Sequence, residues 1–167
     1  MTPVFEVCNN NKLIVYFDGL CEPRNPGGVA CYGWIITSHD GISRHTGRGL
    51  YSTGGPESTN NRAEYAGLWS ALKWLADTKW HGELILCGDS KLVVMQLAKE
   101  CQWRCNAKCL IKARNACLEL LGKITPNMGY SVRWIPREQN HEADELSRQA
   151  YFDIVGKMPP ERHKQYA

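Results

Sequence analysis

Two apolar segments of the chain each end on an aspartate that is followed by turn-forming residues. The first runs from Leu13 to Asp18 and the second from Leu84 to Asp89, and both have the composition of buried β-strands. A charged carboxylate at the end of a buried strand is costly unless it has a partner. The two strand ends therefore predict one shared acidic pocket, and a divalent cation is the partner that we expect there.

The hydrophobic pattern predicts a single α/β domain over residues 1–155, followed by a C-terminal tail at 156–167. Strands are expected at residues 12–18, 28–37, 43–52, 83–88 and 130–135. Helices are expected from residue 60, after Ser90, at 106–121 with Gly122 as the stop, and at 140–152. The element order βββαβααβα fits a sheet whose first three strands are antiparallel, with the third at an edge, and in which helical crossovers add the last two strands in parallel.

Two further acids lie on the expected helices. Glu64 continues the apolar stripe that Leu68 and Leu75 mark, and so should point toward the sheet. A second interpretation of Glu64 stays open, since an acid in the first turn of a helix interacts favourably with the helix dipole. Asp144 lies beside the apolar stripe of the last helix, which includes Leu146. The acids expected to converge are Asp18, Glu64, Asp89 and Asp144.

Carboxylate oxygens suit the hard cations Mg²⁺ and Mn²⁺, which share their coordination with substrate phosphates. Two such ions about 3.5–4 Å apart can generate an attacking hydroxide and stabilise the leaving oxygen of a phosphoryl displacement. No serine or cysteine has the surroundings of a nucleophile elbow, and no glycine-rich loop carries the lysine of a P-loop. The four acids are therefore the candidate metal ligands and catalytic residues.

Composition sets the class of protein and leaves its partner open. Of the 167 residues, 43% are hydrophobic and 22% are charged, which is ordinary for a globular domain. No apolar run approaches the roughly 20 residues that span a bilayer, and no leader segment is visible, so we expect a cytoplasmic protein with reduced cysteines and no membrane partner. Seven basic residues between Lys91 and Lys123 oppose two acidic ones, which fits either a solvated helix face or a surface that faces phosphates.

Four sequence blocks extend the pattern beyond the acids. The blocks are Asp18–Gly28, Ser58–Tyr65, Asp89–Ser90 and Trp134–Ser147. With these blocks in register, the chain resembles ribonuclease H type 1, or ribonuclease HI. The resemblance implies an RNase H-like fold of the α/β class, in which helices flank a five-stranded mixed sheet with the strand order 3-2-1-4-5.

The resemblance also implies an activity and a cofactor. Members of this family cleave the RNA strand of RNA/DNA hybrids endonucleolytically and leave 3′-hydroxyl and 5′-phosphate ends. Asp18, Glu64, Asp89 and Asp144 match the family's four metal-binding carboxylates, with Asp18 bridging two Mg²⁺ ions, for which Mn²⁺ is a possible substitute. We expect a monomer that binds RNA/DNA hybrids.

Six positions are expected to contact the substrate. They are Asn25, Thr59, Asn60, Asn61, Ser90 and Lys91. In the family, the threonine belongs to a pocket for a DNA phosphate, and the amides read 2′-hydroxyls and base edges, for which a group that donates and accepts is suited. Lys91 stands where an amide often follows Asp-Ser, and a lysine reaches a phosphate better than a base edge. Thr59 and its neighbours are also typical of a helix N-cap, and both roles can hold together.

The chain departs from many family members in two places. The connection between Lys99 and Lys108 is too short for the long basic protrusion that follows the middle helices elsewhere. A compact Pro136–His141 segment replaces the glycine-rich loop that carries a catalytic histidine in many bacterial members. Both features place the chain in an archaeal-like branch. His141 either assists proton transfer or product release, or is a solvated residue at the start of a helix.

Two rival functions remain open beside the hybrid nuclease. One is another nuclease of the same fold, such as a Holliday-junction resolvase or a transposase-like domain, against which the block Thr59–Asn61 favours a hybrid substrate. The other is a non-catalytic nucleic-acid binding module, whose signature would be the loss of a metal ligand. Double-stranded RNA stays open as an additional substrate.

Overall fold

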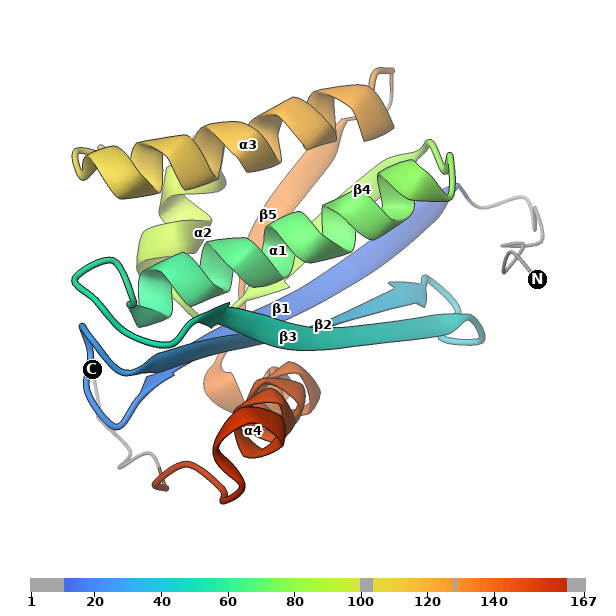
Figure 1. Ribbon diagram of the computed structural model, residues 1–167. Helices are drawn as coiled ribbons and strands as arrows, with labels where there is room; N and C mark the ends of the chain where they lie inside the picture. Colours follow the sequence, from blue (N-terminus) through green and yellow to red (C-terminus); the bar gives the residue numbers. More distant parts are fainter. Residues whose placement is uncertain (1–10, 100–103, 128, 162–167) are drawn as a thin grey trace.

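The computed structural model describes residues 11–99, 104–127 and 129–161. Within these residues, a five-stranded sheet carries helices on both faces (Figure 1). The strands are β1 (Lys12–Glu22), β2 (Val29–Ser38), β3 (Arg44–Ser52), β4 (Glu83–Gly88) and β5 (Tyr130–Trp134). The helices are α1 (Asn60–Asp77), α2 (Lys91–Leu97), α3 (Lys108–Ile124) and α4 (His141–Val155), with a 3₁₀ turn at Arg137–Gln139.

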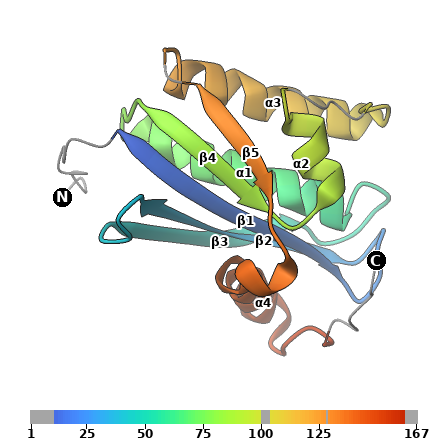
Figure 2. The same ribbon diagram turned by 180° about the vertical axis from the view of Figure 1, so that it is seen from behind.

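The sheet has the strand order β3-β2-β1-β4-β5, which confirms the expected topology. β1, β2 and β3 form an antiparallel meander, and β4 and β5 join in parallel. β1 is the central strand, and β3 forms one edge. Helices α1 and α3 lie over one face and α4 lies alone over the other, as the two opposite views show (Figure 2). No helix in the described ranges combines the length and apolarity that a membrane crossing requires.

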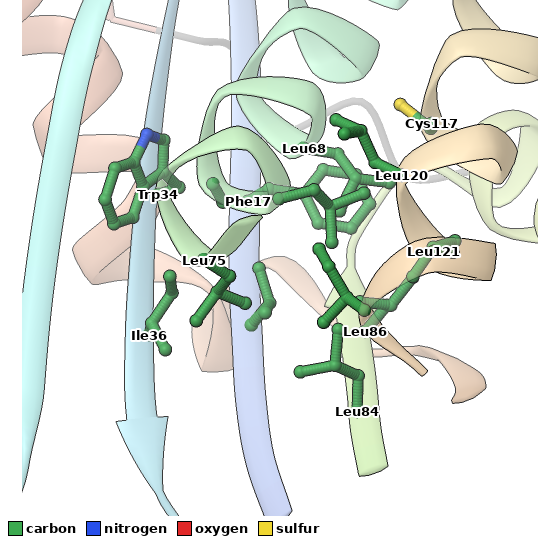
Figure 3. Packing of buried hydrophobic residues seen from close by; sticks show 14 of the residues in the cluster. Phe17, Trp34, Ile36, Leu68, Leu75, Leu84, Leu86, Cys117, Leu120 and Leu121 are labelled. Carbon is green, nitrogen blue, oxygen red and sulfur yellow. The ribbon is translucent and has the colours of Figure 1, made fainter. Parts of the chain in front are cut away.

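The main hydrophobic core fills the space between the sheet and helices α1 and α3 (Figure 3). Phe17 of β1 and Leu86 of β4 contribute from the sheet, and Leu68 and Leu121 contribute from the two helices, all with their side chains excluded from solvent. A smaller cluster on the opposite face, including Leu20 and Tyr151, packs α4 against β1 and β2. Because α1 and α4 press on opposite faces of the same strand, side chains from both helices can meet at β1.

The limits of three elements differ from the sequence-based expectation, and the simplest case is α4, which runs to Val155, three residues beyond the expected end. β1 does not end at Asp18, because antiparallel pairing with β2 continues to the pair Glu22↔Val29. α3 does not stop at Gly122 but runs on to Ile124, and the Thr125 hydroxyl donates to a carbonyl of its last turn. Apolar burial of Ile124 outweighs the weak helix propensity of one glycine, which costs about 1 kcal/mol.

The packed face of α4 also differs in detail. Leu146 is only half-buried, and Ser147 takes its place among the fully buried residues of the helix. The α4 backbone lies so close to β2 that a Cβ added at Gly33 would come within 2.6 Å of Ser147 N. Such a close approach favours a small side chain on the helix.

The limits of the domain, expected at residues 1–155 with a tail at 156–167, stay a prediction. Within the described part of the tail, the carbonyls of Pro159 and Pro160 accept hydrogen bonds from Arg148 of α4.

Candidate active site

The register of the parallel strands brings Asp18 and Asp89 side by side. β1 and β4 pair from Lys12↔Glu83 to Tyr16↔Cys87. Each aspartate stands two residues beyond the last pair, and residues two apart on a strand share a face. β4 ends at Gly88 whereas β1 continues along β2, so the two strands part where their aspartates lie. The two aspartates therefore stand next to each other at the point where β4 leaves the central strand.

Glu64, from helix α1 on one face of the sheet, adds a third carboxylate to the two aspartates. One carboxylate oxygen from each of Asp18, Glu64 and Asp89 lies within 4.8 Å of the other two. The approach depends on Gly19, since a Cβ added there would lie 2.3 Å from the Glu64 backbone nitrogen. Glu64 is only 3% exposed, and the first turn of α1 contains no acidic residue. The helix-dipole interpretation of Glu64 is therefore wrong, and its inward direction is confirmed.

Asp144 lies on α4, the helix that covers the other face of the sheet, and is not one of the gathered acids. Its side chain is half-buried near the start of α4, outside the group of three oxygens that lie within 4.8 Å of one another. Ser147, one turn later, connects the helix to the site, because its hydroxyl lies 3.1 Å from Asp18 Oδ2 and 2.7 Å from the Asp144 carbonyl oxygen. Three of the four expected ligands are thus gathered, and the fourth lies on the helix that contacts Asp18.

Two buried polar residues that the sequence-based reasoning missed hold the aspartates. Ser147 donates to Asp18, as described above. Asn140 is only 1% exposed, and its Nδ2 donates to the Phe17 carbonyl at 2.9 Å and to Asp89 Oδ2 at 3.2 Å. Asn140 stands at the N-cap position of α4 but makes no capping hydrogen bond with its side chain. Its amide instead fixes the relative positions of β1, β4 and α4.

The rim next to Asp89 is formed by α2 and the end of β5. Ser90 caps α2 by accepting a hydrogen bond from Val93 N at 3.4 Å, as expected for a helix start. Trp134 Nε1 donates to the Asp89 carbonyl at 2.9 Å. The exposed Lys91 ammonium lies 5.0 Å from the centroid of the Trp134 ring. Lys91 is therefore positioned beside the acids and in contact with solvent.

The four remaining expected substrate residues lie together at the start of α1, and hydrogen bonds link three of them, Asn25, Asn60 and Asn61. Asn25 Nδ2 donates to Asn60 Oδ1 at 2.8 Å, and Asn60 N donates back to Asn25 Oδ1 at 3.2 Å. Asn60 Oδ1 also accepts from Asn61 N at 2.9 Å. Thr59 is the N-cap and accepts from Arg62 N at 3.1 Å, so its capping role is confirmed. The cluster leaves Asn25 and Asn60 exposed.

Buried Ser58 joins the two loops that carry this cluster. Its hydroxyl donates to the Gly28 carbonyl at 2.6 Å, and its carbonyl accepts from Gly27 N at 2.8 Å. The Cys21 thiol lies 3.1 Å from the same Ser58 carbonyl. The loop after β1 and the loop before α1 are thereby held together, which fixes Asn25 against Asn60.

The donor set fits hard divalent cations. All three gathered donors are carboxylate oxygens, the ligands that Mg²⁺ and Mn²⁺ prefer. At Mg–O distances of 2.0–2.1 Å, opposite ligands of one ion stand about 4 Å apart. The limit of 4.8 Å on the oxygen separations is compatible with that spacing after a small movement of the side chains.

His141 lies outside this group of donors. It is the first residue of α4, is exposed, and its Nδ1 is 3.2 Å from the Glu138 carbonyl oxygen. It lines a pocket of about 210 Å³ on the α4 face of the sheet, together with Tyr16 and Asn140. Its assistance in proton transfer or product release stays a prediction.

Comparison with known proteins identifies the family to which the chain belongs. Residues 17–150 match the model of the reverse transcriptase-like family. The curated ribonuclease HI of Halobacterium salinarum is 34% identical over 156 residues, which cover 92% of this chain and 71% of that protein. The chain belongs to the ribonuclease HI family. The prediction of an enzyme of the ribonuclease H type is thereby confirmed, and the alternative of a non-catalytic binding module is not.

Solved structures of ribonucleases HI agree with the fold and with the archaeal-like branch. The crystal structure of RNase H1 from Halobacterium salinarum superimposes with a TM-score of 0.72 at 34% identity, covering 86% of this chain and 99% of that one. LC11-RNase H1, solved in complex with an RNA/DNA hybrid, gives a TM-score of 0.73 at 27% identity with the same coverage. In this protein a short segment with one 3₁₀ turn connects β5 to α4, which agrees with the compact connection that the sequence predicts. Residues 100–103, within the expected short connection after α2, lie outside the described residues.

Proposed function

We propose that this ribonuclease HI hydrolyses the RNA strand of RNA/DNA hybrids by a two-metal-ion mechanism and leaves 3′-hydroxyl and 5′-phosphate ends. The observation that carries the proposal is the gathering of carboxylate oxygens from β1, α1 and β4 within 4.8 Å of one another. The complex of LC11-RNase H1 with an RNA/DNA hybrid supports the choice of substrate.

Asp18, Glu64, Asp89 and Asp144 would hold the ions. Two bound Mg²⁺ ions supply a hydroxide nucleophile at neutral pH and stabilise the leaving oxygen. Asp18 lies on the central strand, is gathered with Glu64 and Asp89, and contacts Ser147 of α4, so it would be the ligand shared by both ions. Ser147 and Asn140 keep the carboxylates of Asp18 and Asp89 in place before substrate arrives, so little reorganisation is needed during the reaction.

The cluster at the start of α1 would align the hybrid. Side-chain amides donate and accept, which allows Asn25, Asn60 and Asn61 to read a 2′-hydroxyl, the group that distinguishes RNA from DNA. Thr59 stands at the N-terminus of α1, where backbone N–H groups and the helix dipole favour a phosphate. Ser90 and Lys91 follow Asp89 directly at the rim of the site and would contact a strand of the hybrid there. The Lys91 ammonium would bind one of its phosphates.

A cleavage assay tests the proposal. End-labelled RNA/DNA, RNA/RNA and DNA/DNA duplexes are incubated with the protein in Mg²⁺, in Mn²⁺ and in EDTA, and the product ends are identified by their sensitivity to phosphatase. We expect cleavage of the RNA strand of the hybrid in either metal and none in EDTA. The RNA/RNA arm tests double-stranded RNA as an additional substrate.

Two matched variants separate the site from the rest of the surface. Asp89→Asn removes a gathered donor and should abolish cleavage while hybrid binding persists. Asp153→Asn changes an exposed aspartate of α4 that pairs with Arg48, and should leave cleavage unchanged. Cleavage by the Asp89→Asn protein at the wild-type rate would refute the two-metal assignment.

A further inference from the structure

The outer side of α1 carries a hollow that the proposed cleavage reaction does not use. It measures about 420 Å³ and lies between the end of β3 and the first half of α3. Six of the residues that line it define what we call the α1 groove: Leu50, Tyr51, Arg62, Ala66, Trp69 and Lys112. Arg62, Ala66 and Trp69 follow one another at helical spacing along α1, so they share one face of that helix. The small side chain of Ala66 leaves the hollow open between the two larger ones.

Large apolar side chains at this groove are exposed to solvent. Trp69 is 41% exposed and Leu50 is 40% exposed. The core-facing side of α1 is formed by other residues, such as Leu68 and Leu72, which are fully buried. Trp69 therefore contributes little to the core, and an exposed tryptophan beside a hollow is typical of a binding surface.

The charged residues of the groove are cationic. Arg62 and Lys112 line it from opposite sides, on α1 and α3, and none of the described lining residues is acidic. The guanidinium carbon of Arg62 lies 5.2 Å from the centroid of the Tyr51 ring. Exposed Lys108 precedes Lys112 by one helical turn on α3. Aromatic rings between cations are typical of grooves for single-stranded nucleic acid, where bases stack on the rings and phosphates meet the cations.

The groove is continuous with the cluster that is proposed to align the hybrid. Arg62 N donates to Thr59 Oγ1, so one residue lines the groove and supports the N-cap of the cluster. From Arg62, the groove continues along α1 to Trp69, about 10 Å further on at 1.5 Å per residue. A strand that passes Thr59 can thus enter the groove without leaving the protein surface.

We propose that the α1 groove binds a single-stranded extension of the substrate, with a base stacked on Trp69 and phosphates held by Arg62 and Lys112. This inference rests on the proposed function, since the duplex part of the substrate brings the extension to the groove. Stacking and charge act on DNA and RNA alike, and either strand of the hybrid can supply the extension. The protein would then favour hybrids that adjoin single-stranded segments over isolated blunt duplexes.

Steady-state cleavage tests the groove with blunt hybrids and with hybrids that carry an extension of about ten nucleotides. Separate arms place the extension on the DNA strand and on the RNA strand. For the wild-type protein, we expect the extension on one of the strands to lower KM about tenfold, which corresponds to one stacked base. Trp69→Ala should reduce this advantage to less than about twofold. Phe152→Ala, which removes an aromatic ring of 44% exposure from α4, should preserve it.

A binding measurement separates this inference from the proposed function. The anisotropy of labelled single-stranded oligonucleotides reports their binding without any cleavage, and Trp69→Ala should weaken that binding about tenfold. Lys112→Ala should lower the slope of log Kd on log salt by about 0.7, the value for one phosphate contact with a single strand. If hybrids are not cleaved while this binding depends on Trp69, the proposed function fails and the groove assignment stands.

Three results would overturn the groove assignment. One is an equal advantage of the extension in the wild-type and Trp69→Ala proteins, and another is oligonucleotide binding that does not respond to Trp69→Ala. The third is a wild-type dimer that Trp69→Ala converts to a monomer in sedimentation, because the groove would then be a contact between two copies of the chain.

Discussion

The substitution Gly19→Ala should move the start of α1, and with it Glu64, away from β1. The added Cβ would lie 2.3 Å from the Glu64 backbone nitrogen and 2.5 Å from the Ala63 carbonyl carbon, both of which are backbone atoms that no rotamer change can move. To restore ordinary contact, the start of α1 must withdraw from β1 by about 1 Å, and a displacement of this size at a catalytic group costs about 10²-fold in rate. Overpacking of this kind also costs about 1–3 kcal/mol of folding free energy.

The assay for Gly19→Ala is the initial rate of hybrid cleavage at saturating Mg²⁺, together with the free energy of unfolding from a urea titration. Gly122→Ala is the matched control, because a Cβ added there meets no atom within 4 Å and lies on the exposed side of α3. The control should raise stability by about 0.5–1 kcal/mol and leave the rate unchanged. A Gly19→Ala protein with the wild-type rate and stability would show that the contact between β1 and α1 does not position Glu64.

Three further predictions test other parts of the structure. Asn140→Ala should destabilise the fold by about 1–3 kcal/mol and lower kcat with little change in KM, because Asp89 loses its buried donor; an unchanged kcat would contradict the positioning role. Mg²⁺ at 100 times its Kd should stabilise the protein by about 2.7 kcal/mol, measured as a rise in Tm that Asp18→Asn abolishes, and a flat thermal response would argue against metal binding by the acids. Burial raises the pKa of the Cys31 thiol to about 11 and also raises the pKa of Cys117. Both thiols therefore stay protonated at pH 8, so iodoacetamide should label them only after denaturation, and mass spectrometry that finds native Cys117 alkylated would contradict this.

The pattern of the sequence was sufficient to predict the strands, whereas their order came from the family resemblance. Strand-forming runs bounded by turn residues mark β2, β3, β4 and β5 to within one residue at each end. The length of β1 was missed because Gly19 and the residues after it carry a turn signature, whereas the pairing partner that extends the strand lies on β2. Local patterns report local preferences, and a strand limit depends on the neighbouring strand.

The restriction to local patterns also explains which residues of the site could be predicted. Asp18, Glu64 and Asp89 were predictable because a carboxylate at a buried position is costly without a partner. An acid at the end of an apolar segment or on an apolar stripe can be recognised from the sequence alone. Asn140 was missed because a polar residue at a helix start has an ordinary explanation in capping, and Ser147 was missed because a serine within a helix carries no signal of its own. Only the packing of α4 against β1 shows that their side chains donate to Asp89 and Asp18 instead. The signal in the sequence was their place within the Trp134–Ser147 block.

The position of the site follows from the topology of the sheet. β1 is the strand at which pairing changes from antiparallel, with β2, to parallel, with β4. β4 ends at Gly88 and the chain begins α2 at Lys91, so Asp18 and Asp89 lie at the carboxyl ends of parallel strands, the place where open α/β sheets bind ligands. Helices on both faces of the sheet come close to this strand end because Gly19 and Gly33 carry no Cβ.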